Sequence, residues 1–279
     1  MRATSERIEV KSPEQIKLMR RAGLVVADAL DAVRAALRPG VSTLELDGIA
    51  EHVIRSAGGT PSFLGYGRPP YPASTCISVN DEVVHGIPGA RLLRAGDIVS
   101  VDCGAILAGW HGDAAFTAVV DPDDAPDSDP ADENLVEVTE HCMWRGIAAI
   151  AEGHRLVDVG AAIEDHVAGR FGIVEEYGGH GIGTAMHQAP HVLNYRTRSK
   201  GPKLKPGMCL AIEPMLTIGD PATRVQPDQW TVVTADGSRA AHWEHSVALT
   251  DRGLWVLTAR DGGESALAEL GMKVVPLAD

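Results

Sequence analysis

The chain has 279 residues, 44% of them hydrophobic, and carries a formal net charge of −13 at pH 7. This length is enough to bury one large core or two smaller ones, whereas the acidic balance argues against direct binding to nucleic-acid phosphates. No apolar run approaches the roughly 20 residues that cross a bilayer, and the first 15 residues lack the apolar stretch of a secretory signal, so neither membrane insertion nor secretion is predicted.

Two helices are predicted at the start of the chain. Ser12-Pro13-Glu14-Gln15 combines a capping box with proline at the first helical position. Apolar residues at helical spacing follow until Pro39-Gly40. A second helix is predicted to start at Ser42-Thr43-Leu44-Glu45 and to end near Gly58-Gly59.

Two strands are predicted next, over 98–106 and 110–120, joined by a turn at Leu107-Ala108-Gly109. A hairpin centred between Leu107 and Ala108 would place Asp102 directly opposite Asp113. Carboxylates that face each other across a strand pair repel, and burial adds the loss of their hydration. Three arrangements relieve this conflict: a register that turns the acids into water, a shared proton, or a cation between them.

The acidic, proline-interrupted stretch DPDDAPDSDPADE (121–133) holds seven acids and no base, and it reads as a surface linker. Helices are predicted after it over 133–152 and 158–170, and strands around 209–216, 230–234 and 240–249. Residues 235–238, Ala-Asp-Gly-Ser, predict a hairpin between the last two strands.

This order of elements predicts an α+β fold, with antiparallel strands at the centre and helices outside. We expect a single catalytic domain over 1–279, made of two similar halves at about 11–120 and 133–258 that the linker 121–132 joins. The four cysteines (Cys76, Cys103, Cys142 and Cys209) form no Cys-x-x-Cys pair. That spacing favours the reducing cytoplasm over a disulfide scaffold or a zinc ribbon.

Further polar residues stand where core residues are expected, namely Glu213, Glu244, His180 and His187. Each has an ordinary explanation, because strand glutamates usually point outward, lone histidines are mostly structural, and the glycines of GGHGIG suit a tight turn. Together with Asp102 and Asp113, however, they would place four negative charges in one cavity. Two divalent cations would cancel that charge, and oxygen ligands with one imidazole suit Mn, Fe, Co or Zn.

Five motifs together make the resemblance to a known family specific: CISVNDEVVHGIP (76–88), VDCGAILAGWHGD (101–113), GGHGIGTAMH (178–187), AIEPML (211–216) and WEHSVALT (243–250). The sequence resembles the type I methionine aminopeptidases, which have the creatinase-like pita-bread fold of two halves related by a pseudo-twofold axis. The resemblance covers almost the whole chain. It implies the same fold here.

By this resemblance the metal ligands are Asp102, Asp113, His180, Glu213 and Glu244. They would hold two divalent ions (Co, Mn, Fe, Zn or Ni), with Asp102 bidentate to one ion, His180 bound to the other, and Asp113 and Glu244 bridging. Glu213 would act as general base and then acid, His187 would stabilise the oxyanion, and His85 would hold the scissile amide. A monovalent cation is expected near Asn80.

The same resemblance implies a substrate pocket of Phe63, Tyr66, Tyr71, Cys76, Met186 and Trp230, with His85 and His187 beside it. The chain departs from the common pattern in places. Met186 stands where an aromatic residue is frequent, Gln188-Ala189 replaces a commonly acidic pair, and the GYGRPPYP segment before Cys76 is longer than usual. Cys103-Gly104 and Ala114-Ala115 replace residues that often carry hydroxyl groups. None of these changes removes a ligand.

The expected function is removal of the N-terminal methionine from nascent proteins and peptides with a small second residue, by a hydroxide that bridges the two metal ions. The expected partner is the N-terminal segment of nascent polypeptides, and transient ribosome association by a cytoplasmic monomer is compatible with it. Two alternatives stay open. One is an Xaa-Pro aminopeptidase or prolidase-like activity on the same fold, and the other is a catalytically inactive peptide-binding relative.

Overall fold

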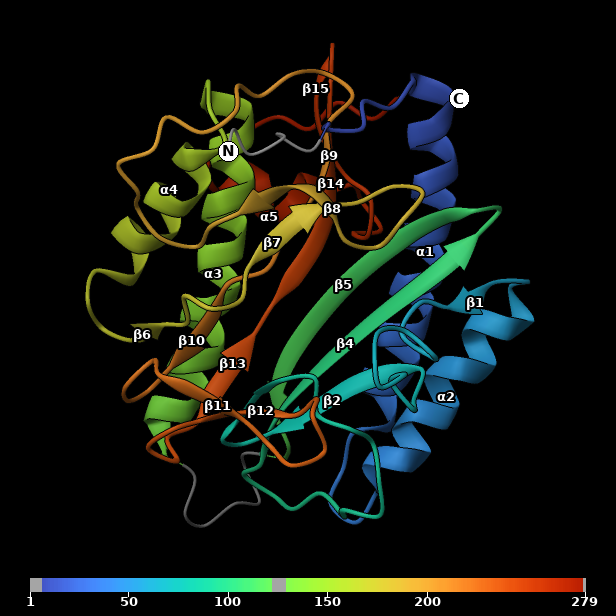
Figure 1. The fold of residues 1–279 in the computed structure, drawn as a ribbon, viewed down its shortest axis with the longest axis vertical. Helices are drawn as coiled ribbons and strands as arrows, with labels where there is room; N and C mark the ends of the chain where they lie inside the picture. The colour runs from blue at the N-terminus through green and yellow to red at the C-terminus, as the bar shows by residue number, and fades with distance from the viewer. Residues whose placement is uncertain (1–6, 122–128, 278–279) are drawn as a thin grey trace.

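The computed structural model describes residues 7–121 and 129–277 and is built around the long hairpin of β4 (Ile98–Leu107) and β5 (Trp110–Val119) (Figure 1). The described strands of the main sheet follow the order β1-β4-β5-β14-β9-β7-β8, with β2 beside β4 and β15 beside β14. Smaller sheets have the orders β13-β10-β6 and β11-β12-β3. Their neighbouring strands are antiparallel, as the sequence predicts.

The bounds of the elements, in chain order, are α1 (Pro13–Ala36), α2 (Thr43–Ser56), β1 (Thr60–Pro61), β2 (Thr75–Val79), β3 (Glu82–Val84), β4 (Ile98–Leu107), β5 (Trp110–Val119), α3 (Pro130–Glu152), α4 (Val157–Val167), β6 (Gly172–Ile173), β7 (Gly179–Gly181), β8 (Gln188–Val192), β9 (Cys209–Ile212), β10 (Met215–Thr217), β11 (Thr223–Val225), β12 (Val232–Thr234), β13 (Ala240–His242), β14 (Glu244–Thr250), β15 (Gly253–Val256) and α5 (Glu264–Glu269).

The starts of the first helices follow from their caps. Ser12 Oγ accepts a hydrogen bond from Gln15 N at 3.3 Å, and Gln15 Oε1 accepts one from Ser12 N at 2.8 Å, which together form the predicted capping box. Ser42 and Glu45 repeat the arrangement at the start of α2. α3 begins earlier than predicted, because Asp129 caps it and Pro130 occupies its first turn.

The helices lie outside the sheet, which confirms the predicted α+β architecture. α1 packs against β4 and β5, and α3 packs against β5, β13 and β14. In Figure 1, α1 and α2 lie on the right of the sheet, and α3 and α4 lie on the left. α1 and β5 approach closely because glycines meet at the contact: a Cβ on Gly112 would lie 2.7 Å from the backbone N of Gly23.

The hairpin register differs from the prediction by two residues. The turn residues are Ala108 and Gly109, both at positive φ (51° and 80°), as a two-residue turn of the type I′ class requires. Asp102 therefore pairs with Ala115, and Asp113 pairs with Gly104. The two acids are diagonal neighbours on one face rather than directly opposed, so a register that separates their faces is excluded.

Two predicted strands and one predicted hairpin are wrong. The strand predicted over 209–216 breaks at Glu213-Pro214 into β9 and β10, which belong to different sheets, because proline cannot donate to the ladder. The strand predicted over 240–249 breaks at Trp243 into β13 and β14, which belong to different sheets. The turn at 235–238 joins β12 to β13, but these strands also pair in different sheets and form no hairpin.

Most of the predicted acidic linker lies outside the described residues, and the division of one domain into two halves stays a prediction. Among the helices of residues 7–121 and 129–277, none has the length and apolar character needed to cross a membrane.

Candidate active site

The predicted metal-binding residues come from separate strands of the main sheet and meet at its centre. Asp102 lies on β4, Asp113 on β5 and His180 on β7, while Glu213 follows β9 and Glu244 begins β14. β5 neighbours β14, which neighbours β9, which neighbours β7. Residues far apart in the sequence are thus placed side by side by strand pairing.

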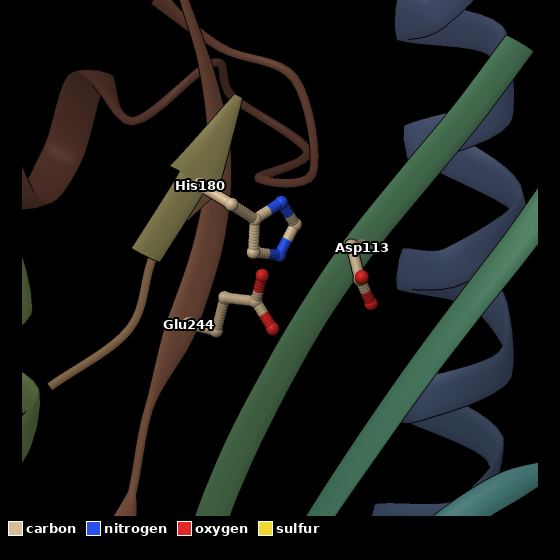
Figure 2. Close-up of side chains that lie close together, drawn as sticks. All are labelled: Asp113, His180 and Glu244. Carbon is tan, nitrogen blue, oxygen red and sulfur yellow. The ribbon is translucent and has the colours of Figure 1, made fainter. Parts of the chain in front are cut away.

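Three of these side chains form the tightest group. Ligand atoms of Asp113, His180 and Glu244 all lie within 4.8 Å of one another (Figure 2). Glu213 joins the group through its Oε1, which lies 3.4 Å from His180 Nε2. Asp102 lies diagonally across the hairpin from Asp113, on the same face, and the charges of the two carboxyl groups interact.

The four carboxyl groups destabilise one another's charged forms. Burial raises the pKa of Asp113 to about 7. Burial, followed by the negative charge of Asp113, holds the pKa values of Asp102, Glu213 and Glu244 well above their ordinary range. In the absence of a cation this cavity favours bound protons near neutral pH.

The imidazole of His180 is neutral. Burial, helped by neighbouring His187, lowers the pKa of His180 to about 3. His180 Nδ1 lies 3.1 Å from the carbonyl oxygen of Gly181, and since a carbonyl only accepts, Nδ1 carries the proton. The lone pair of Nε2 therefore faces the acidic group, as a metal-binding imidazole requires.

A cavity of about 280 Å³ opens onto the acidic group, and every predicted catalytic, metal-binding and substrate-binding residue lines it. An apolar cluster within its wall consists of Phe63, Tyr71, Ala73, Cys76 and Met186, with Ile87 and Trp230 packed against it. Gly104 permits this arrangement, because a Cβ there would lie 2.8 Å from Ser62 Cβ and 3.0 Å from Phe63.

Tyr71 and Tyr66 occupy different parts of the cavity. Tyr71 is 2% exposed, and its hydroxyl donates to the carbonyl oxygens of Thr75 and Gly86 at 3.1 and 2.8 Å. Tyr66 is 40% exposed and lies outside the apolar cluster, with its hydroxyl 2.7 Å from His187 Nδ1. The structure thus brings Tyr66 to the histidine rather than to the apolar wall.

His85 lines the cavity beside Tyr177 and Trp230. Its ring meets Tyr177 and Trp230 edge to face, at centroid distances of 5.7 and 6.1 Å. Burial lowers the pKa of His85 to about 4, so its imidazole is neutral. Asn80 takes no part in this cavity: its side-chain amide donates to Asp97 Oδ1 and its Oδ1 accepts from Ile98 N, and the cation expected near it stays a prediction.

Sequence reasoning missed several cavity residues. His242 is 2% exposed, and its Nε2 lies 3.6 Å from Glu213 Oε2. Its spacing of two residues from Glu244 was the available signal, because alternate strand residues share a face. Tyr177, Glu176 and His191 also line the cavity, and no pattern in the sequence pointed to them.

The polar atoms of the site fit a divalent metal. Buried Asp102 Oδ1, Asp113 Oδ1 and Glu244 Oε1 have no hydrogen-bond partner among the described residues, although buried acceptors are normally satisfied. Carboxylate oxygens with one imidazole nitrogen are ligands of Mn, Fe, Co and Zn. A bound cation would coordinate the unpartnered oxygens and would also offset the crowded negative charges.

A curled antiparallel sheet with helices outside and an acid–histidine centre define a metallopeptidase of the pita-bread class. The model of metallopeptidase family M24 matches residues 17–251. Methionine aminopeptidase 1 of Mycobacterium tuberculosis is 55% identical over 256 residues, which are 89% of this chain and 94% of that protein. Methionine aminopeptidase 1 of Bacillus subtilis is 45% identical over 251 residues, with 89% and 98% covered.

Solved structures agree with these relatives. Methionine aminopeptidase from Thermotoga maritima superposes with a TM-score of 0.85 at 40% identity, covering 91% of this chain and 100% of that one. Prolidase from Pyrococcus furiosus, at 20% identity and a TM-score of 0.70 over 90% of this chain and 65% of its own, shares the fold alone. The chain belongs to metallopeptidase family M24, among its methionine aminopeptidases.

Proposed function

We propose that the chain removes the N-terminal methionine from nascent polypeptides and peptides whose second residue is small. The observation that carries this proposal is the position of the apolar cluster next to the acid–histidine centre in one cavity. A side chain in the cluster would bring the first peptide bond of a substrate to the acidic groups.

Asp102, Asp113, His180, Glu213 and Glu244 would hold two divalent ions. Bound divalent metal supplies a Lewis acid and lowers the pKa of water to near neutrality. The carboxylates would neutralise the charge of the ions. His180 presents Nε2 because Gly181 holds its Nδ1 proton.

Glu213 is our candidate for the proton transfer. Its side chain is 12% exposed, and the two flanking histidines are neutral, so neither one competes for its proton. A carboxyl with a raised pKa, such as that of Glu213, can accept a proton from the attacking water and pass it to the leaving amine.

His187 is our candidate for the oxyanion donor. Burial raises the pKa of Tyr66, which keeps its hydroxyl protonated and able to donate to His187 Nδ1, 2.7 Å away. The proton of the neutral imidazole then resides on Nε2, where it can hydrogen-bond to the developing oxyanion. His85, which also lines the cavity, would hold the scissile amide.

Methionine specificity would come from the apolar cluster. An unbranched thioether adapts to a wall of aromatic rings with Met186 and Cys76. A methylene-sized difference in such a pocket is worth about 1–3 kcal/mol, so leucine would be discriminated against, but not excluded.

The test is release of free methionine from Met-Ala-Ser and Met-Leu-Ser by protein stripped of metal and then loaded with Mn, Co, Fe, Zn or Ni. We expect metal-dependent release from Met-Ala-Ser, much less from Met-Leu-Ser, and two metal equivalents per chain by elemental analysis. Ala-Pro and Met-Pro dipeptides test the prolidase-like alternative. Hydrolysis of Xaa-Pro alone, or metal binding without any hydrolysis, would refute the proposal.

A further inference from the structure

The segment before α1 carries a buried ammonium group. The side chain of Lys11 is 1% exposed, and its Nζ lies 3.2 Å from the carbonyl oxygen of Glu9 and 3.4 Å from Gln188 Oε1. The Glu9 carboxylate, 3.6 Å away, is the one acidic group within ion-pair distance of Lys11 in the described residues. A buried charge is costly unless it is paired and hydrogen-bonded, so Glu9 is needed to hold Lys11 in place.

This pair contacts the loop that joins β7 to β8. The loop, residues 182–187, contains Gly183, Thr184 and Ala185, small residues that bury little surface of their own. The next two residues, Met186 and His187, line the active-site cavity. Their positions therefore depend on what holds the loop from outside the cavity.

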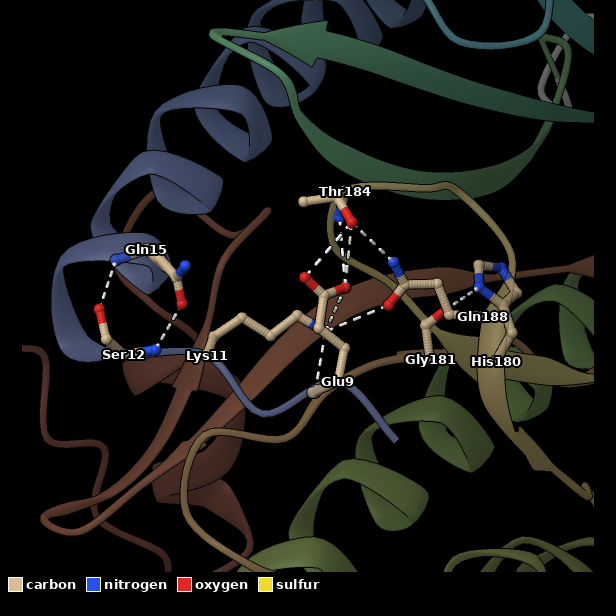
Figure 3. A network of polar contacts seen from close by, with 8 residues as sticks. All are labelled: Glu9, Lys11, Ser12, Gln15, His180, Gly181, Thr184 and Gln188. Atoms are coloured by element: carbon tan, nitrogen blue, oxygen red, sulfur yellow. Dashed lines mark hydrogen bonds and ion pairs between the residues drawn. The ribbon is translucent and has the colours of Figure 1, made fainter. Parts of the chain in front are cut away.

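Both ends of the loop are held by the same pair (Figure 3). At the first end, the Glu9 carboxylate accepts hydrogen bonds from Thr184 N at 3.5 Å and from Thr184 Oγ1 at 3.3 Å. The Lys11 stem covers Gly183 so closely that a Cβ there would lie 2.5 Å from Lys11 Cε. At the other end, Gln188 bonds Lys11 Nζ and donates to Thr184 Oγ1.

We infer that the Glu9–Lys11 pair is a positioning device for His187. It fixes both ends of the loop, so that the imidazole stands at the depth and angle its role in the cavity requires. The inference rests on the proposed role of His187. It predicts that the effect of Glu9, at the outer surface of the loop, on kcat passes through that histidine.

Residue 188 makes the inference sharply testable. Because Gln188 is neutral, the charge of Lys11 depends on Glu9, although Gln188 reaches the same ammonium group. A carboxylate moved from position 9 to position 188 should therefore restore the ion pair from the other side. A general loss of stability at position 9 would not be repaired in this way.

The experiment compares wild type, Glu9→Gln, Glu9→Gln with Gln188→Glu, His187→Ala, and Glu9→Gln with His187→Ala. Exposed Glu133→Gln serves as the charge-matched control. Each metal-loaded protein is assayed for kcat and KM on Met-Ala-Ser, and its folding is checked by circular dichroism. Hydrogen–deuterium exchange of the 182–188 loop supplies a readout that does not depend on turnover.

We expect Glu9→Gln to lower kcat at least about tenfold, within the roughly 10²-fold that a displacement of about 1 Å can cost, and to speed exchange in the loop. Gln188→Glu should restore most of the lost kcat and most of the lost protection of the loop from exchange. Once His187 is alanine, Glu9→Gln should not lower kcat further. Normal kcat in folded Glu9→Gln, no rescue, or an undiminished effect in the His187→Ala background would each overturn the inference. If wild type released no methionine, the proposed function would fail instead. The exchange data would still test whether the Glu9–Lys11 pair holds the loop.

Discussion

His180 and Glu213 lie 3.4 Å apart without forming a charged pair. Burial lowers the pKa of the imidazole and raises that of the carboxyl, so both groups tend toward neutrality when the cavity holds no cation. A cation reverses the balance for the acids and uses the free Nε2 of the imidazole. The protonation states of the two groups therefore suit a bound cation better than an ion pair between them.

These protonation states make Glu213→Gln informative. The amide keeps the size of the side chain and can still hydrogen-bond, but it cannot accept a proton, so we expect folded protein with kcat on Met-Ala-Ser lowered by about 10²–10⁴-fold. Glu175→Gln is the control. Glu175 is exposed and precedes residues that line the cavity, so this variant should retain wild-type turnover. Circular dichroism and metal analysis check folding and loading. Near-wild-type turnover by loaded Glu213→Gln would remove this residue from the proton transfer.

At the scale of elements, the first two helices and their caps were well predicted, because their signals are local: Ser12 with Gln15 and Ser42 with Glu45 each form the predicted box. The short helix α5 was not predicted. The pairing of the strands was predicted less well. The hairpin register depends on whether Ala108-Gly109 or Leu107-Ala108 forms the turn, and only the former pair ends in glycine, the residue that best tolerates positive φ. Which sheet β12 and β13 join depends on distant strands.

The contact between α1 and β5 predicts a second substitution effect. In Gly112→Ala the new Cβ would lie 2.7 Å from backbone N and 2.8 Å from Cα of Gly23. Backbone cannot rotate away, so the helix must move, and overpacking of this kind costs about 1–3 kcal/mol. Urea denaturation should show that loss in the free energy of unfolding.

Gly48→Ala is the matched control, because Gly48 lies in α2 and its Cβ would meet nothing within 4 Å. Alanine is favoured over glycine in a helix by about 1 kcal/mol, so this variant should be as stable as wild type or more stable. If Gly112→Ala proved as stable as Gly48→Ala, the close packing of α1 on the hairpin would be refuted.

At the scale of the molecule, the residues that meet in the cavity were predicted as a set, but their geometry was not. Charge crowding and the family motifs pointed to Asp102, Asp113, Glu213 and Glu244, and all of them line one cavity. His242 was missed although it lies two residues from Glu244, and the Glu9–Lys11 pair was not predicted because its importance arises from a contact with a segment more than 20 residues away. Such contacts leave no local periodicity in the sequence.

The acidic cavity also sets how the whole chain should respond to pH without metal. A carboxyl whose pKa is raised by folding binds its proton more tightly in the folded state, so its contribution to stability is lost as pH rises through the folded pKa. For Asp113 that value is about 7, and for Asp102, Glu213 and Glu244 it is raised as well. The buried histidines have lowered pKa values and act oppositely, but only below their unfolded pKa of about 6.5.

Between pH 6.5 and 8 the carboxyl effect therefore stands alone. We expect the Tm of metal-free protein in EDTA to fall over this range, by up to about 1.4 kcal/mol of stability per pH unit for each proton held only in the folded state. Metal requires deprotonated ligands, so the gain in Tm on adding Mn or Co should grow over the same range. Asp102→Asn, with one carboxyl fewer, should show both a shallower fall without metal and a smaller gain with it. A metal-free Tm that stays level or rises from pH 6.5 to 8 would contradict the crowding of acids on which the metal centre is argued.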